Sequence, residues 1–174
     1  MDDLRVRLRR ETAEAHERLD LAVSVFGMET SEGRAALLEA LTGGYRAVLG
    51  LRYAPVSKAR EIAARPLIAL GEMPAESVDA GPEIDESAAA YVFVGSHLGM
   101  QVLTTAWEQA TGRMPPPPLG MPPMASEWQD VRSRLSGMPA TGAVADRVVA
   151  DAIRLFEPFH TGVIGARRSR VRAA

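Results

Sequence analysis

Hydrophobic positions along this chain recur at helical spacing, and no stretch alternates convincingly as a β-strand. Apolar residues over residues 2–24 are spaced by three, four and seven: Leu4, Leu8, Ala15, Leu19 and Ala22. This spacing places them on one face of a helix. We therefore expect one amphipathic helix over residues 2–24.

Five further helices are predicted in the same way. Thr30 or Ser31 can cap the second helix, because a side-chain oxygen there accepts from a free backbone N–H of the first turn. The helices are expected at residues 30–49, about 57–70, about 84–110, 127–135 and 142 to about 164. Five or six helices without strands predict an all-α domain.

Two connections and one tail interrupt this pattern. Residues 71–82 form a polar linker with two prolines. Residues 111–124 hold six prolines and cannot form a regular helix, so we expect a rigid surface connection there. The basic tail, residues 166–174, is expected to be frayed. No internal repeat is visible, and residues 1–174 are expected to form a single domain.

Composition narrows the class of protein. At 174 residues with 47% hydrophobic content, the chain can bury its own core, and without cysteine it has no disulfides or thiolate metal ligands. A formal charge of −2 argues against broad affinity for nucleic acid. No signal peptide or membrane-spanning stretch is visible, so we expect a cytoplasmic protein without a membrane partner.

The segment from Leu8 to Asp20, LRRETAEAHERLD, carries a candidate metal ligand. On a continuous helix His16 shares a face with Arg9, Thr12 and Asp20. A neutral imidazole binds a metal through one nitrogen and donates the other N–H to a carboxylate or water, a role open to Asp20. The alternative is a surface histidine on an amphipathic helix.

The segment from Tyr91 to Leu103, YVFVGSHLGMQVL, carries Gly95 and Gly99 on one helical face. Glycine inside a helix lowers its stability by about 0.5–1 kcal/mol relative to alanine. We therefore expect each of these glycines to serve a packing or a binding role. Because glycine has no side chain, a neighbouring helix or a flat ligand can approach the backbone at these positions. Spacing alone favours helix packing.

Taken together, the two segments resemble the proximal and distal haem helices of the biliverdin-producing haem oxygenases, in particular the short bacterial branch associated with phytochromes. The first segment matches that pattern at Leu8, Arg9, Thr12, His16 and Leu19. The second matches at Tyr91, Val92, Gly95, Ser96, Leu98, Gly99, Gln101, Val102 and Leu103. The order and the separation of about 80 residues also fit.

The resemblance implies a haem-oxygenase-like helical bundle with haem between the first and fourth helices. His16 would be the axial iron ligand, with Asp20 as its hydrogen-bond partner and Arg9 against a haem propionate. Thr12 would leave room for the porphyrin edge. On the other side of the haem, the resemblance implies a distal pocket lined by Gly95, Ser96 and Gly99.

The implied reaction is the oxidative opening of haem to biliverdin, with release of carbon monoxide and ferrous iron. Haem would be both substrate and cofactor. No P-loop, dinucleotide fingerprint or zinc spacing is present, so we expect electrons from a separate donor of reductase or ferredoxin type.

Other positions depart from the family pattern or extend it. Met100 stands where relatives carry a second glycine, and it would either crowd the oxygen site, offer its thioether to iron, or turn into the core. His97 replaces a threonine and is expected to be a packing residue. Phe156 is a candidate porphyrin contact and Arg132 a candidate propionate contact.

Two other functions stay open at this point. The first is a non-catalytic haem-binding or haem-sensing protein on the same fold, which Met100 would favour. The second is a helical domain of the related thiamine-salvage type, which does not bind haem.

Overall fold

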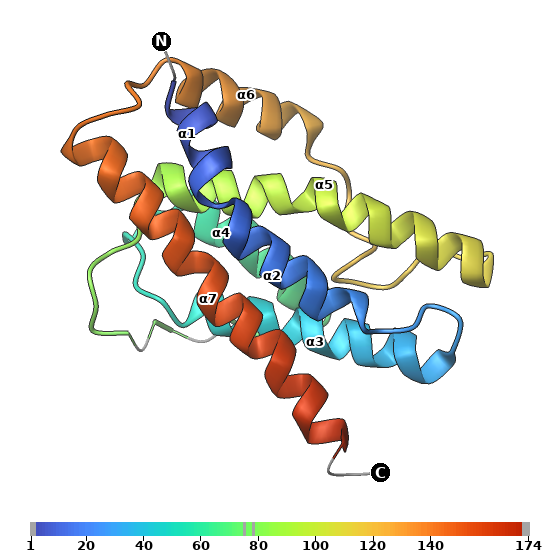
Figure 1. Cartoon of the computed structure of the whole chain (residues 1–174). Helices are drawn as coiled ribbons and strands as arrows, with labels where there is room; N and C mark the ends of the chain where they lie inside the picture. The colour runs from blue at the N-terminus through green and yellow to red at the C-terminus, as the bar shows by residue number, and fades with distance from the viewer. Residues whose placement is uncertain (1–2, 75, 78, 172–174) are drawn as a thin grey trace.

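Seven α-helices and no β-strand make up the described part of the chain in a computed structural model (Figure 1). The structure describes residues 3–74, 76–77 and 79–171, with only the backbone for 166–171. The helices are α1 (Leu4–Glu11), α2 (Ala13–Ser24), α3 (Ser31–Leu49), α4 (Lys58–Ala69), α5 (Glu86–Thr111), α6 (Ala125–Ser136) and α7 (Ala143–Val171). The predicted all-α fold class is confirmed.

The expected first helix is in fact two helices, α1 and α2, which meet at Thr12. Thr12 has φ −92° and ψ −3°, and its hydroxyl donates to the Leu8 carbonyl at 2.8 Å. A threonine hydroxyl that bonds its own backbone competes with regular helix geometry. The apolar periodicity runs through this position, so the pattern alone did not reveal the break.

Helices α3 and α7 form the centre of the bundle and cross at a very short distance. A Cβ placed on Gly43 would lie 3.1 Å from the Gly162 carbonyl oxygen, and one on Gly44 would lie 2.7 Å from the Phe159 ring. Glycines therefore let the two backbones approach where the helices cross. Around this crossing lies the apolar core, which includes the fully buried Val48 and Leu155.

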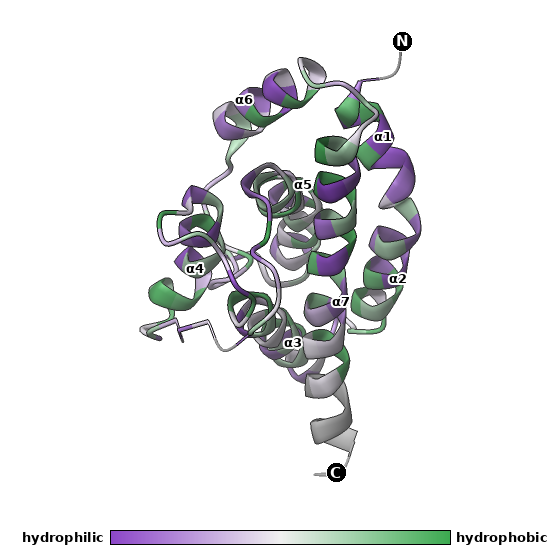
Figure 2. Ribbon diagram, turned by 90° about the vertical axis from the view of Figure 1, so that its left-hand side faces the viewer, coloured by the Kyte–Doolittle hydropathy of each residue, from purple (hydrophilic) through white to green (hydrophobic). Residues whose placement is uncertain are grey.

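The other helices surround this pair. Figure 2 shows α5 near the middle, with α6 above it, α4 on one side and α1 and α2 on the other. Helix α5 packs against α4, α6 and α7, whereas α2 packs mainly against α7. Arg7 anchors α1 to the beginning of α7. It donates to the Ala140 carbonyl at 2.8 Å and forms an ion pair with Asp146 at 2.7 Å.

Helix α7 also holds the linker that precedes α5. Arg154 donates to the Pro82 carbonyl at 2.7 Å and to Asp79 at 2.6 Å. The buried Asp151 accepts from the backbone N–H of Asp85 at 2.9 Å, and Asp85 is the N-cap of α5. These contacts fix where the long central helix begins.

Helix α7 continues to Val171, and residues 172–174 lie outside the described part, so the frayed tail expected over residues 166–174 stays a prediction. Alanine and arginine are good helix formers, and they follow Gly165 without a proline in this stretch. No helix in the described part of the chain combines the length and apolar character needed to cross a bilayer.

Candidate functional site

His16 lies on the exposed side of α2 and is oriented by its neighbour one turn on. Its Nδ1 lies 2.9 Å from Oδ2 of Asp20. The ring of Phe156, from α7, meets the imidazole edge to face with centroids 6.0 Å apart. The His16 side chain is 55% exposed. The imidazole is thus held on two sides while much of it stays open.

The neighbours expected on the same face do not all lie there. Arg9 is exposed, but it belongs to α1, so the break at Thr12 separates it from the His16 helix. Thr12 is buried, at 3% exposure, and its hydroxyl is occupied by the Leu8 carbonyl. Asp20 alone is brought into direct contact with His16.

The two glycines of α5 have different surroundings. A Cβ on Gly95 would lie 3.2 Å from the Trp128 ring of α6, so helix packing accounts for this glycine. No atom lies within 4 Å of a Cβ placed on Gly99, which is exposed. Its neighbours Leu98 and Val102 are 51% and 70% exposed. Packing therefore does not explain Gly99.

Ser96 and Met100 lie on the inner side of α5. Ser96 donates to the Phe93 carbonyl at 2.8 Å. Burial raises the pKa of Tyr45 of α3 to about 12, and the nearby Ser96 opposes this shift to a smaller extent. Met100 is 7% exposed and belongs to the core. The thioether is thus turned away from the open Gly99 face.

A cavity of about 560 Å³ lies between the end of α2 and the second half of α5. Its lining residues are Ser24, Phe26, Gly27, Met28, Glu29, Ala106, Gln109 and Ala110. Ala106 is seven residues beyond Gly99 and continues its helical face, whereas Ser24 is eight beyond His16 and lies about 80° round the helix from it. The cavity therefore lies beyond His16 and Gly99, and neither residue lines it.

Sequence reasoning did not find the cavity residues. The segment Phe26–Glu29 carried no motif, and the α5 residues beyond Leu103 lie outside the matched pattern. The spacing of Val102, Ala106 and Gln109 from Gly99 would have indicated them, because these positions share one face of a helix.

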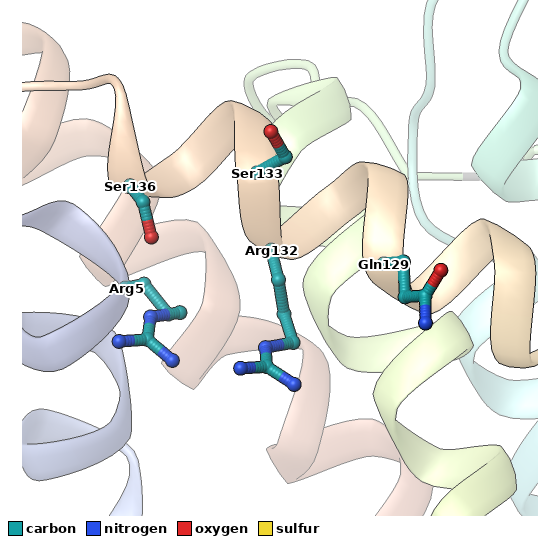
Figure 3. Close-up of a pocket in the computed structure, with 5 residues that line it drawn as sticks. All are labelled: Arg5, Gln129, Arg132, Ser133 and Ser136. Atoms are coloured by element: carbon teal, nitrogen blue, oxygen red, sulfur yellow. The ribbon is translucent and has the colours of Figure 1, made fainter.

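Arg132 lies elsewhere, in a hollow between α1 and α6 that it shares with Arg5 (Figure 3). The residues lining this hollow do not include any that line the α2–α5 cavity. The propionate contacts expected for Arg132 and Arg9 stay predictions.

A metal site built from protein ligands alone is not found in the described part of the chain, where no group of three or more histidine, aspartate or glutamate side chains could hold an ion.

Comparisons with protein-family models, curated proteins and solved structures found no match for this chain.

Proposed function

We propose that this protein binds haem between α2 and α5 through His16 and that it is a haem oxygenase, which opens haem to biliverdin with release of carbon monoxide and ferrous iron. The observation that carries the proposal is the oriented, open imidazole of His16 on α2, beside Phe156, together with the exposed and unpacked Gly99 of α5. The resemblance of the two helices supplies the reaction.

The donor chemistry at His16 suits an axial iron ligand. A neutral imidazole whose Nδ1–H donates to the Asp20 carboxylate leaves the Nε2 lone pair free for a metal. A carboxylate at this position fixes the orientation of the ring. One histidine would be sufficient where a porphyrin supplies the remaining iron ligands, so the lack of a protein-only metal cluster among the described residues does not argue against haem.

The surface around Gly99 suits a flat, largely apolar molecule. Leu98 and Val102 of α5 expose apolar side chains beside Gly99. Gly99 lets a ring approach the α5 backbone. A volume of about 560 Å³ lies within the usual range for small-molecule sites, about 300–1,000 Å³.

Haem, once bound, supplies the iron that activates oxygen and the carbon skeleton that is opened. The residues of this chain have more limited tasks. His16 and Asp20 hold one side of the ligand, Phe156 limits rotation of the imidazole, and the α5 backbone near Gly99 covers the other side. The proposal includes a separate electron donor and a cytoplasmic location.

The test is addition of haem to the purified full-length protein. We expect a shifted Soret band, its loss or change in His16→Ala, and little change in His160→Ala, a histidine of α7 that serves as the control. Biliverdin should then form when a competent electron donor is supplied.

The possible outcomes separate the candidate functions. A His16-dependent band without biliverdin would leave haem binding in place and refute the oxygenase. The absence of any shift would refute both, and would favour the related helical domain that does not bind haem.

A further inference from the structure

The hollow between α1 and α6 has a volume of about 400 Å³ and is lined only by polar side chains (Figure 3). They are Arg5, Gln129, Arg132, Ser133 and Ser136. Four of them belong to α6, where Arg132, Ser133 and Ser136 follow Gln129 by three, four and seven residues and therefore share its side of the helix. Every lining side chain carries an N–H or O–H donor, and none is a carboxylate.

The hollow that holds the two arginines lies near one carboxylate, that of Asp3. Figure 3 shows both guanidinium groups pointing the same way, with the Ser136 hydroxyl turned toward Arg5. Within the described residues Arg132 has no ion-pair partner. Oδ1 of Asp3 lies 3.9 Å from Nε of Arg5 and accepts from the Val6 N–H at 2.8 Å. This hydrogen bond, the nearby Ser136 hydroxyl and the Arg5 charge all help to lower the pKa of Asp3. Two like charges so placed favour an anion between them.

One donor of Arg5 is also left without an acceptor. Its Nε is buried and has no hydrogen-bond partner in the described structure. Buried polar atoms are nearly always hydrogen-bonded, and an exception indicates a bound ion, a water or a ligand group.

We propose that this hollow binds a phosphate group, either free phosphate or the phosphate of a small monoester. A phosphate offers several oxygens in different directions, which matches two planar guanidinium forks and a hydroxyl better than a single carboxylate does. The site is independent of the proposed haem function, because the hollow and the α2–α5 cavity share no residue.

The experiment titrates inorganic phosphate into the full-length protein at constant ionic strength, followed by amide chemical shifts and calorimetry. We expect saturable shifts confined to α1 and α6. Arg132→Gln should weaken binding on the order of tenfold or more, as loss of a charge-assisted hydrogen bond does. Arg134→Gln is the matched control, because this exposed arginine of the same helix removes the same charge outside the hollow.

Further arms identify the ligand and can overturn the assignment. Glycerol 3-phosphate that binds more tightly than inorganic phosphate would identify a monoester, and the reverse order would identify the free ion. Succinate binding as tightly as phosphate would refute a phosphate site, and so would equal losses in Arg132→Gln and Arg134→Gln. Displacement of phosphate by haem would make the hollow part of the haem site and refute an independent one.

Discussion

Gly162 of α7 meets Gly43 of α3 so closely that a methyl group on Gly162 would lie 2.5 Å from the Gly43 carbonyl oxygen. The atom it would strike is backbone, which cannot rotate aside as a side chain does. The crossing of the two central helices therefore depends on glycine at this position, independently of any bound ligand.

Gly162→Ala should lower the free energy of unfolding by about 1–3 kcal/mol, as overpacking a core does. Gly165→Ala, one turn further along α7, is the control, because no atom lies within 4 Å of a Cβ there. That change should raise stability by about 0.4–1 kcal/mol. Urea unfolding measures both, and a stable Gly162→Ala protein would mean that the helices are not this close.

Gly99→Ala should have opposite effects on stability and on haem affinity. Without a neighbour within 4 Å, the added methyl should stabilise α5 by about 0.5–1 kcal/mol. If haem lies against this face, the same methyl should weaken haem binding. Thermal unfolding and haem titration of the same sample separate the two effects.

Gly95→Ala provides the comparison for Gly99→Ala. Its methyl would lie 3.2 Å from Trp128, so it should disturb the α5–α6 contact and leave haem affinity unchanged. Equal haem affinity in Gly99→Ala and the parent protein would exclude the Gly99 face as the haem surface.

Met100→Leu should leave the ferric haem spectrum and turnover unchanged, because the thioether lies in the core. A volume-conserving exchange of this kind usually costs less than about 1.5 kcal/mol. Met100→Gly is less informative, since removal of a buried side chain destabilises the apoprotein by several times more. A spectral change in Met100→Leu would show that sulfur reaches the iron.

His97 should make the fold sensitive to mild acid. Burial, helped by nearby Arg65 and opposed by Glu127, lowers the pKa of His97 below its ordinary value of 6.5. Above pH 6.5 the imidazole is neutral in both states, so stability is unaffected. As pH falls through 6.5 toward the folded-state pKa, the unfolded chain takes up the proton first, and stability falls.

Urea unfolding between pH 7.5 and 5 measures this effect in the parent and in His97→Gln. The range ends above the region where Asp3, Glu11 and Glu72 titrate, because their pKa values lie below 3.8–4.5. The pH slope should be smaller in His97→Gln, whatever its absolute stability. Equal slopes would mean that His97 protonates as readily in the folded state.

The helices were largely predictable because they depend on local pattern. Thr30 caps α3 as expected, with its hydroxyl accepting from the Gly33 N–H at 3.0 Å, and Ser57 caps α4 in the same way. The break at Thr12 was missed, since a single side-chain hydrogen bond interrupts an otherwise continuous apolar pattern.

The candidate site was only partly predictable, because it depends on contacts between distant segments. Spacing placed Asp20 beside His16 correctly, since both lie on one helix. It could not distinguish Gly95 from Gly99. That difference arises from Trp128 of α6, the helix that follows the proline-rich connection and packs against α5 at Gly95. The cavity and the α1–α6 hollow likewise combine residues far apart in sequence.

Helix α2, which carries His16, contains no buried residue. A helix with so little buried surface opens by local unfolding at a free energy far below that of the whole domain, and its amides should exchange hydrogen fastest among the helices. Any molecule that ligates His16 must first select the ordered form of α2, and its apparent affinity is reduced by the fraction of time the helix is frayed. Binding of a ligand at His16 should therefore slow the hydrogen exchange of the α2 amides far more than that of the α3 or α7 amides.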